Sequence, residues 1–262
     1  MSAHRIAVVV RRHWLVLWRS PHRWVEVGFW PLMDVILWGS LGVFVARQDT
    51  GSRASTAYLL AGIVLFHVLF QVQITATTGV MEETWTRNLL NVLTTPVTEL
   101  EYVVAVGVFG LLKTLLAMAA LTVTTIVLFG FDLSQVGWAV IPVAWILVLN
   151  GWALALLVIG LILRFGQSAE ILTWGLNYVV LALSRVFFPV DALPPRLRSI
   201  AAVLPTTWAF SALRRALDGL PFSWVGFGVA FLTSLLLIVL SGLLATHLLK
   251  VFRRRGFVTR YS

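Results

Sequence analysis

Residues 58–80 read YLLAGIVLFHVLFQVQITATTGV, and these 23 residues contain no Asp, Glu, Lys or Arg. A helix needs roughly 20 mostly apolar residues to cross the ~30 Å hydrocarbon core of a membrane. This stretch therefore predicts a transmembrane helix. Polar segments flank it at 47–53 and 82–96, which indicates that the chain returns to water on either side.

The same pattern recurs along the rest of the chain. Of its 262 residues, 59% are hydrophobic and 12% are charged, and the mean hydropathy is +0.91. Soluble domains carry about 25% charged residues, so a soluble fold is excluded. We expect an all-α integral membrane protein that forms a single domain. Its six predicted transmembrane helices cover residues 24–46, 58–80, 103–129, 137–163, 171–188 and 222–249.

The net charge of +9 indicates an anionic partner, and its distribution favours lipid headgroups over nucleic acid. Within 4–23, Arg5, Arg12 and Arg19 recur every seven residues, which predicts a basic amphipathic helix on the membrane surface, ended by Pro21. Two arginines follow its short apolar stretch where a signal peptide would have a cleavage site, so we expect this segment to be retained. The chain has no cysteine and therefore no disulfide framework.

The positions of Lys and Arg predict the orientation, because cytosolic segments near membrane ends are enriched in both. If the N-terminus is cytosolic, the inner side holds twelve: Arg5, Arg11, Arg12, Arg19, Arg23, Arg87, Arg164, Lys250, Arg253, Arg254, Arg255 and Arg260. The outer side then holds six: Arg47, Arg53, Arg196, Arg198, Arg214 and Arg215. Both termini, including the basic tail 250–262, are therefore expected in the cytosol.

Residues 189–221 contain five prolines and four arginines, too many for a spanning helix. They also carry leucine and isoleucine at helical spacing, so we expect a helical hairpin that re-enters the outer face of the membrane. Backbone that leaves a helix at membrane depth is tolerated where protein or water satisfies its polar groups. The hairpin should therefore pack against the helical bundle or line a cavity.

The segment 81–101, MEETWTRNLLNVLTTPVTELE, lies between the second and third predicted spans on the cytosolic side. It combines leucines at helical spacing with charged residues. One interpretation is a plain interfacial loop helix. The other is a docking helix, whose apolar side chains fill a groove on a partner while its charges fix the register.

This segment and the hairpin resemble parts of the ABC-2 type transporter family, and the resemblance extends over nearly the whole chain. Residues 82–96 resemble the coupling helix of that family. The residues that would contact an ATPase are Glu82, Glu83, Trp85, Arg87, Asn88, Leu89, Leu90, Leu93 and Pro96. Residues 183–217, LSRVFFPVDALPPRLRSIAAVLPTTWAFSALRRAL, resemble its extracellular re-entrant hairpin. The hairpin residues singled out are Phe188, Pro189, Leu193, Pro194, Pro205, Trp208 and Arg214.

Two features depart from the family pattern. The glycine common near the start of the coupling helix is absent here. In addition, Arg185 stands where the family usually has a small residue before the Phe-Phe-Pro at 187–189.

The resemblance implies the permease half of an exporter in the bacterial plasma (inner) membrane. Two copies would pair, and each would bind a nucleotide-binding ATPase subunit. The cargo would be amphipathic: a drug, a lipid or a lipid-linked glycan. The chain contains no GxxxxGK[ST] phosphate loop. ATP and Mg are therefore expected on the ATPase subunit, and no cofactor or catalytic residue is expected on this chain.

Three ionisable residues fall within the predicted spans, where such groups are costly and mark a transport path or a buried pair. Asp34 and Lys113 each lie about ten residues into a span, so an ion pair between them is possible, and Arg185 lies near the end of the fifth. A membrane-embedded transferase or a scaffold is the alternative function. It lacks support, because the histidines have no HExxH or other metal-binding spacing.

Overall fold

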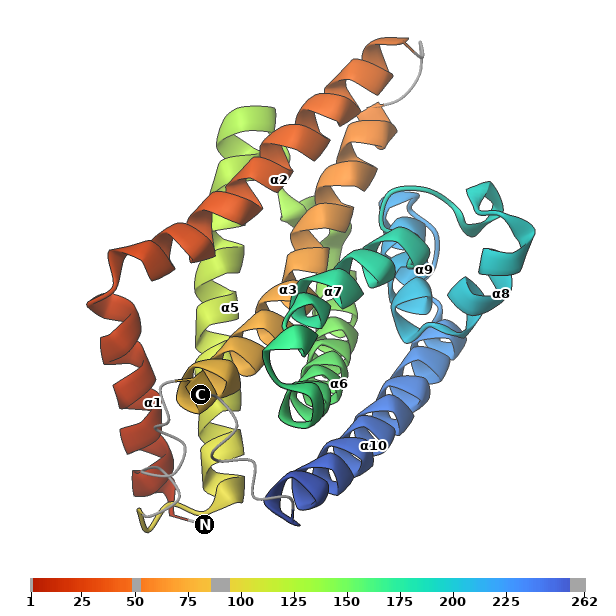
Figure 1. Cartoon of the computed structure of the whole chain (residues 1–262). Helices are drawn as coiled ribbons and strands as arrows, with labels where there is room; N and C mark the ends of the chain where they lie inside the picture. Colours follow the sequence, from red (N-terminus) through yellow and green to blue (C-terminus); the bar gives the residue numbers. More distant parts are fainter. Residues whose placement is uncertain (1, 49–52, 86–94, 255–262) are drawn as a thin grey trace.

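The computed structural model describes residues 2–48, 53–85 and 95–254. Within these ranges every regular element is a helix (Figure 1). The long helices are α2 (Pro21–Gln48), α3 (Arg53–Trp85), α5 (Glu99–Phe129), α6 (Val140–Phe165) and α10 (Trp224–Arg254). The shorter ones are α1 (Ala3–Trp18), η1 (Leu133–Ala139), η2 (Gly166–Ala169), α7 (Ile171–Leu183), η3 (Val190–Ala192), α8 (Pro195–Val203) and α9 (Pro205–Leu217). The predicted all-α fold class is confirmed.

Helix α3 occupies the centre of the bundle. It packs against α2, α5, α6, α7 and α9, and 94% of its apolar stretch is buried. A helix that is hydrophobic on all sides is stable when other helices surround it, which is how α3 is placed. Its Leu60 and Ile63 share one core with Ile146 of α6 and Phe210 of α9. The stretch that most clearly predicted a membrane span thus forms the core of the molecule.

Helices α2 and α10 lie at the periphery. Only 22% of the apolar stretch of α2 and 17% of that of α10 are buried within the chain. Their outward faces carry large apolar side chains, such as Leu37 and Phe44 on α2 and Leu236 and Leu243 on α10. Exposed apolar faces of this extent suit lipid or another protein chain.

Five helices of the described residues are long and apolar enough to cross a membrane: 23–47, 56–81, 104–129, 133–162 and 224–248. The fifth predicted span, 171–188, forms the shorter apolar helix α7, which ends at Leu183. Its 13 residues cover only about 20 Å at 1.5 Å per residue. The sequence prediction placed the end of this span too late because residues 186–188 are still apolar. The helix ends before Arg185, whose backbone is in the left-handed conformation.

Three other helices start earlier or end later than the sequence predicted. Pro21 does not separate the first two helices but occupies the first position of α2, where its missing amide hydrogen has no cost. Helix α3 continues through Trp85, so Glu82, Glu83 and Trp85 extend α3 instead of beginning a separate helix. Helix α5 begins at Glu99 because Thr98 caps it.

The predicted hairpin 189–221 folds into η3, α8 and α9. Pro195 and Pro205 stand in the first turns of α8 and α9, where proline is favoured. Helix α8 is mostly exposed, whereas α9 buries one face, including Ala209, Phe210 and Leu213, against α6 and α10. The hairpin is therefore anchored in the bundle through its second helix.

Candidate functional site

The end of the bundle where α3 stops and α5 begins holds the predicted docking segment. The described chain resumes at Thr95 in an exposed bend with Pro96, and Val97 packs against the core cluster that includes Val9 of α1 and Tyr102 of α5. Arg87, Asn88, Leu89, Leu90 and Leu93 lie outside the described residues. The structure thus fixes both ends of the segment, at Trp85 and at Thr95, and leaves its predicted helix untested.

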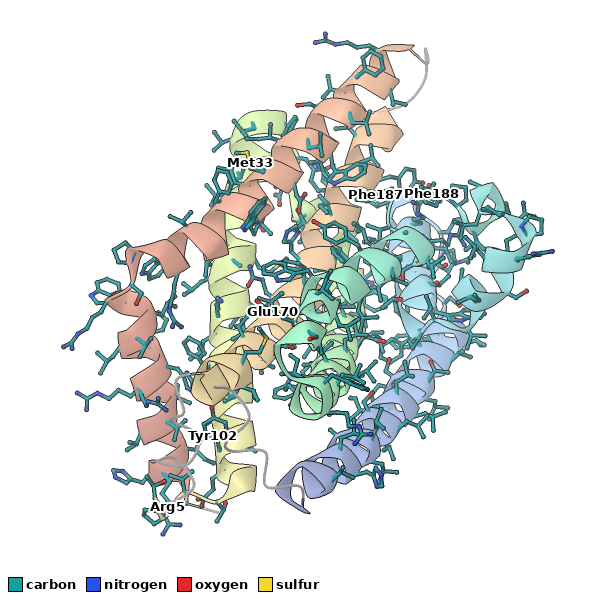
Figure 2. All side chains as sticks on the ribbon, in the orientation of Figure 1. Arg5, Met33, Tyr102, Glu170, Phe187 and Phe188 are labelled. Carbon is teal, nitrogen blue, oxygen red and sulfur yellow. The ribbon has the colours of Figure 1, made fainter. Side chains whose placement is uncertain are left out.

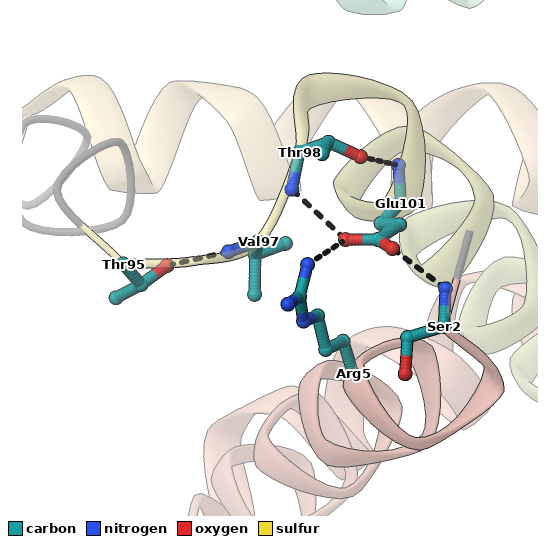
Figure 3. Close-up of polar contacts among 6 residues, drawn as sticks. All are labelled: Ser2, Arg5, Thr95, Val97, Thr98 and Glu101. Atoms are coloured by element: carbon teal, nitrogen blue, oxygen red, sulfur yellow. Dashed lines mark hydrogen bonds and ion pairs between the residues drawn. The ribbon is translucent and has the colours of Figure 1, made fainter.

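Glu101 joins this segment to the N-terminal helix (Figure 3). Its Oε2 accepts from the Thr98 amide at 3.0 Å, and its own amide donates to Thr98 Oγ1 at 3.2 Å, which completes a capping box. The Ser2 amide donates to Oε1 at 2.7 Å, and Arg5 Nη1 lies 3.6 Å from Oε2. These four residues, Ser2, Arg5, Thr98 and Glu101, are called the clasp below.

The clasp holds a carboxylate with only 2% of its surface exposed. Hydrogen bonds from the Thr98 and Ser2 amides, followed by the charge of Arg5, lower the pKa of Glu101 to about 2. The ionised form is therefore the one that fits the clasp. Sequence reasoning did not single out Glu101, although Thr-x-x-Glu ahead of an apolar stretch is a recognisable helix-start signal.

Helix α1 packs lengthwise against the first half of α5. Near its start, Val9 contacts the group formed by Tyr102, Ala105 and Val106, and near its end Leu17 packs with Phe109 and Ala117. Figure 1 shows the two helices side by side. The amphipathic helix predicted at 4–23 is present as α1, and its contacts from Val9 to Leu17 hold it against α5 over about two turns.

Asp34 pairs with a residue that the sequence analysis did not consider. Its Oδ2 lies 3.4 Å from Nε2 of His67, and His67 Nδ1 donates to the Ile63 carbonyl at 2.9 Å. Lys113, which the sequence left as a possible partner of Asp34, is buried on α5. Helix α2 contacts both α3 and α5, and spacing along the sequence did not point to His67 of α3 as the neighbour of Asp34.

Further buried polar contacts connect α3 and α6 to their neighbours. Asn177 Nδ2 on α7 donates to Gln73 Oε1 on α3 at 2.6 Å. Asn150 Nδ2 on α6 donates to Ser234 Oγ on α10 at 2.8 Å. These contacts satisfy buried polar groups and fix helix pairs in register. Amide side chains within an apolar stretch were the available signal for them.

At the other end of the bundle, the hairpin residues meet the end of α7. Leu193 is buried, and the Trp208 indole donates to the Ala202 carbonyl at 3.0 Å, which links α9 to α8. Phe188 is partly exposed, and Pro189 and Pro194 precede η3 and α8. Arg214 reaches back to the chain after α7, where its Nε donates to the Arg185 carbonyl at 3.1 Å. Figure 2 places Phe187 and Phe188 away from Arg5 and Tyr102.

No group of His, Asp or Glu that could hold a metal ion occurs within the parts of the chain that the structure describes. A family model for the ABC-2 type transporter matches residues 4–217, most of the chain. The chain belongs to the ABC-2 type transporter family. Curated proteins provide no match to the sequence.

As an ABC-2 type permease subunit, the chain is a multi-pass membrane protein whose role is transport. Members of this family associate with an ATPase subunit and are typically not catalytic themselves. The matched range includes both the segment between α3 and α5 and the hairpin through Leu217.

Proposed function

We propose that this chain is the permease half of an ATP-driven exporter. It moves an amphipathic cargo, such as a drug, a lipid or a lipid-linked glycan, outward from the cytosol or the inner leaflet. Residues 82–96 receive the movement of a separate ATPase subunit, which holds ATP and Mg. The family match over residues 4–217 carries this proposal, because it is the observation that ties the helices to ABC transport.

The packing of α3 supports a route by which movement of the docking segment reaches the bundle. Trp85 ends the same helix that carries the central core, so displacement of this end moves a helix in contact with α2, α5, α6, α7 and α9. The clasp adds a second connection, because Thr98 and Glu101 follow the segment directly and hold Ser2 and Arg5 of the N-terminal region. A pull on 82–96 therefore acts on α3, α5 and α1 together.

We further propose that two copies pair in the bacterial plasma membrane, with both termini in the cytosol and one ATPase bound to each copy. Asp34 supports the pairing, because 43% of its side chain is exposed on α2 near the middle of a span. A carboxyl group at that depth is costly against lipid. A second copy packed on this face of α2 would cover it.

The docking role is tested by replacing Arg87, Leu89 and Leu90 together with alanine. The tagged chain is purified from its own membranes, and the ATPase that accompanies it is measured by hydrolysis of ATP. We expect the triple variant to lose the ATPase, because truncating central contact residues costs several kcal/mol of binding. Bound ATPase with unchanged activity in this variant would show that the segment is not the docking site.

A matched control comes from α8 at the other end of the bundle. Replacing Arg196, Leu197 and Ile200 with alanine removes the same kinds of side chain from exposed positions. We expect this variant to retain the ATPase. The membrane-embedded transferase or scaffold, the alternative considered above, predicts no ATPase with the wild-type chain either.

A further inference from the structure

The residue that follows α7 has an unusual backbone conformation for its type. Arg185 has a φ of 61°, and it is the only residue other than glycine with a positive φ among residues 2–48, 53–85 and 95–254. Helices commonly end with such a residue, but the position favours glycine, because a Cβ atom is strained there. Strained positions of this kind persist mainly at functional sites. The arginine side chain is therefore the feature to explain.

A second arginine reaches the backbone at the same place. Arg214 donates from Nε to the Arg185 carbonyl at 3.1 Å and from Nη2 to the Val186 carbonyl at 3.3 Å. Its guanidinium also lies over the Tyr58 ring, 5.4 Å from the centroid. Burial, and then the charge of Arg185, lower the pKa of Arg214 to about 10, so it remains protonated near neutral pH. Both arginines thus belong to the corner between the end of α7 and α9: Arg214 binds the backbone of Arg185, and Arg185 Nη1 donates to Ser211 Oγ, one helical turn before Arg214.

No carboxylate balances these charges within the described residues. The ion pairs described above are those of Glu101 and Asp34, at other places in the fold. Arg185 donates from Nη1 to Ser211 Oγ at 3.1 Å, but its Nε is buried and has no hydrogen-bond acceptor. A buried donor without an acceptor is costly, which indicates that an acceptor is missing from this corner.

An aromatic surface adjoins the two arginines. Phe187 stacks on Trp38 of α2 with ring centroids 3.6 Å apart and an interplanar angle of 20°. Phe188 follows with 37% of its surface exposed. Figure 2 labels both phenylalanines in the region between α3 and the hairpin. Charged and apolar recognition elements are therefore available within four consecutive residues, 185–188.

We propose that Arg185 and Arg214 bind the oxyanion headgroup, a phosphate or a carboxylate, of an amphipathic cargo whose apolar part lies along Phe187 and Phe188. Guanidinium groups bind such oxyanions through charge-assisted hydrogen bonds and can do so in a bidentate manner. That the ligand is a transported cargo rests on the function proposed above. The binding site itself rests on the two guanidiniums, the buried donor and the aromatic surface.

Arg185→Gly tests the proposal with little folding penalty, because glycine suits the left-handed backbone at this position and this gain offsets the lost hydrogen bond to Ser211. The purified chain is titrated in dodecyl maltoside with dodecyl phosphate, and binding is followed as a rise in the unfolding temperature. We expect the variant to unfold at the same temperature as the wild type or higher without ligand, and to bind dodecyl phosphate at least tenfold more weakly. Equal affinity would overturn the proposal.

Arg196→Gln is the matched control, since it removes one positive charge from an exposed position of the same hairpin. We expect its affinity to stay within twofold of the wild type. A loss as large as that of Arg185→Gly would overturn the proposal, because it would show attraction by net charge. Arg185→Lys should bind with intermediate affinity, because it keeps the charge but loses the planar guanidinium.

Two further titrations distinguish the source of the oxyanion. Inorganic phosphate is expected to bind at least tenfold more weakly than dodecyl phosphate, and equal affinity would overturn the role of the aromatic surface. In nanodiscs, phosphatidylglycerol is expected to compete weakly with dodecyl phosphate for the site. Displacement of dodecyl phosphate at equal concentration would assign the site to bulk lipid and overturn the proposal that it binds cargo. None of these measurements uses an ATPase, so they succeed or fail independently of the docking experiment.

Discussion

At the residue scale, Glu101 concentrates the polar contacts that hold the start of α5 to the start of α1. One carboxylate accepts two backbone hydrogen bonds and faces Arg5, so a single side chain connects two segments, 2–5 and 98–101, that are far apart in sequence. Charge-assisted hydrogen bonds of this kind are stronger than neutral ones. The clasp should therefore respond to the protonation of one group.

The lowered pKa of Glu101 gives the direction of the pH dependence. The folded-state pKa is about 2 and the ordinary value is 4.5, so the clasp adds stability above pH 4.5 and loses it as the pH falls toward 2. We expect Glu101→Gln to lower the unfolding temperature at pH 7 and to have little effect near pH 2. Thermal unfolding of both proteins across this range, with Glu170→Gln as a control, measures the difference. A difference that does not depend on pH would contradict the prediction.

At the element scale, the position of α3 depends on close approach by its neighbours. A Cβ atom on Gly151 of α6 would lie 2.8 Å from the Leu69 carbonyl oxygen and 2.8 Å from Val72 Cβ. These contacts leave no room for a methyl group between α6 and α3. Small residues at helix contacts allow close packing of this kind in membranes.

We expect Gly151→Ala to destabilise the protein by about 1–3 kcal/mol, the usual cost of overpacking. Gly175→Ala on α7 is the matched control, because nothing lies within 4 Å of the added methyl group. That variant should be neutral or more stable by up to about 1 kcal/mol, since alanine favours a helix. Unfolding in detergent measures both changes, and equal effects would mean that α3 and α6 are not in close contact.

At the scale of the whole molecule, the two peripheral helices expose apolar faces that differ in one respect. The exposed face of α2 includes Asp34, whereas the described part of α10 from Trp224 to Leu248 contains no acidic residue. Lipid suits the face of α10, and a protein chain suits that of α2. This difference predicts which face a second copy covers.

Because the chain has no cysteine, single cysteines report on this pairing without background. Leu37→Cys lies one helical turn from Asp34, and Leu236→Cys is equally exposed on α10. In native membranes, a short bis-maleimide should link the α2 variant into a species of twice the mass and leave the α10 variant as a monomer. A cross-linked dimer of the α10 variant alone would place the interface on α10 and contradict the prediction.

The sequence predicted what depends on composition and local pattern. Apolar stretches of more than 20 residues give an all-helical membrane protein, because backbone polar groups must be satisfied within each segment in lipid. Proline positions predicted the hairpin, and the order of motifs predicted the ABC-2 family, which the match over 4–217 confirms. The proposed contact with an ATPase remains a prediction, since residues 86–94 lie outside the described structure.

The tertiary structure alone decided which residues meet. It placed His67 beside Asp34, ended α7 at Leu183 and laid α1 along α5. It also brought Arg214 to the backbone carbonyl of Arg185. Periodicity shows which residues share a face of a helix, but every apolar face in a membrane protein can pack against several others. The choice depends on close approach between particular side chains, as at Gly151, and this information is spread over distant parts of the chain.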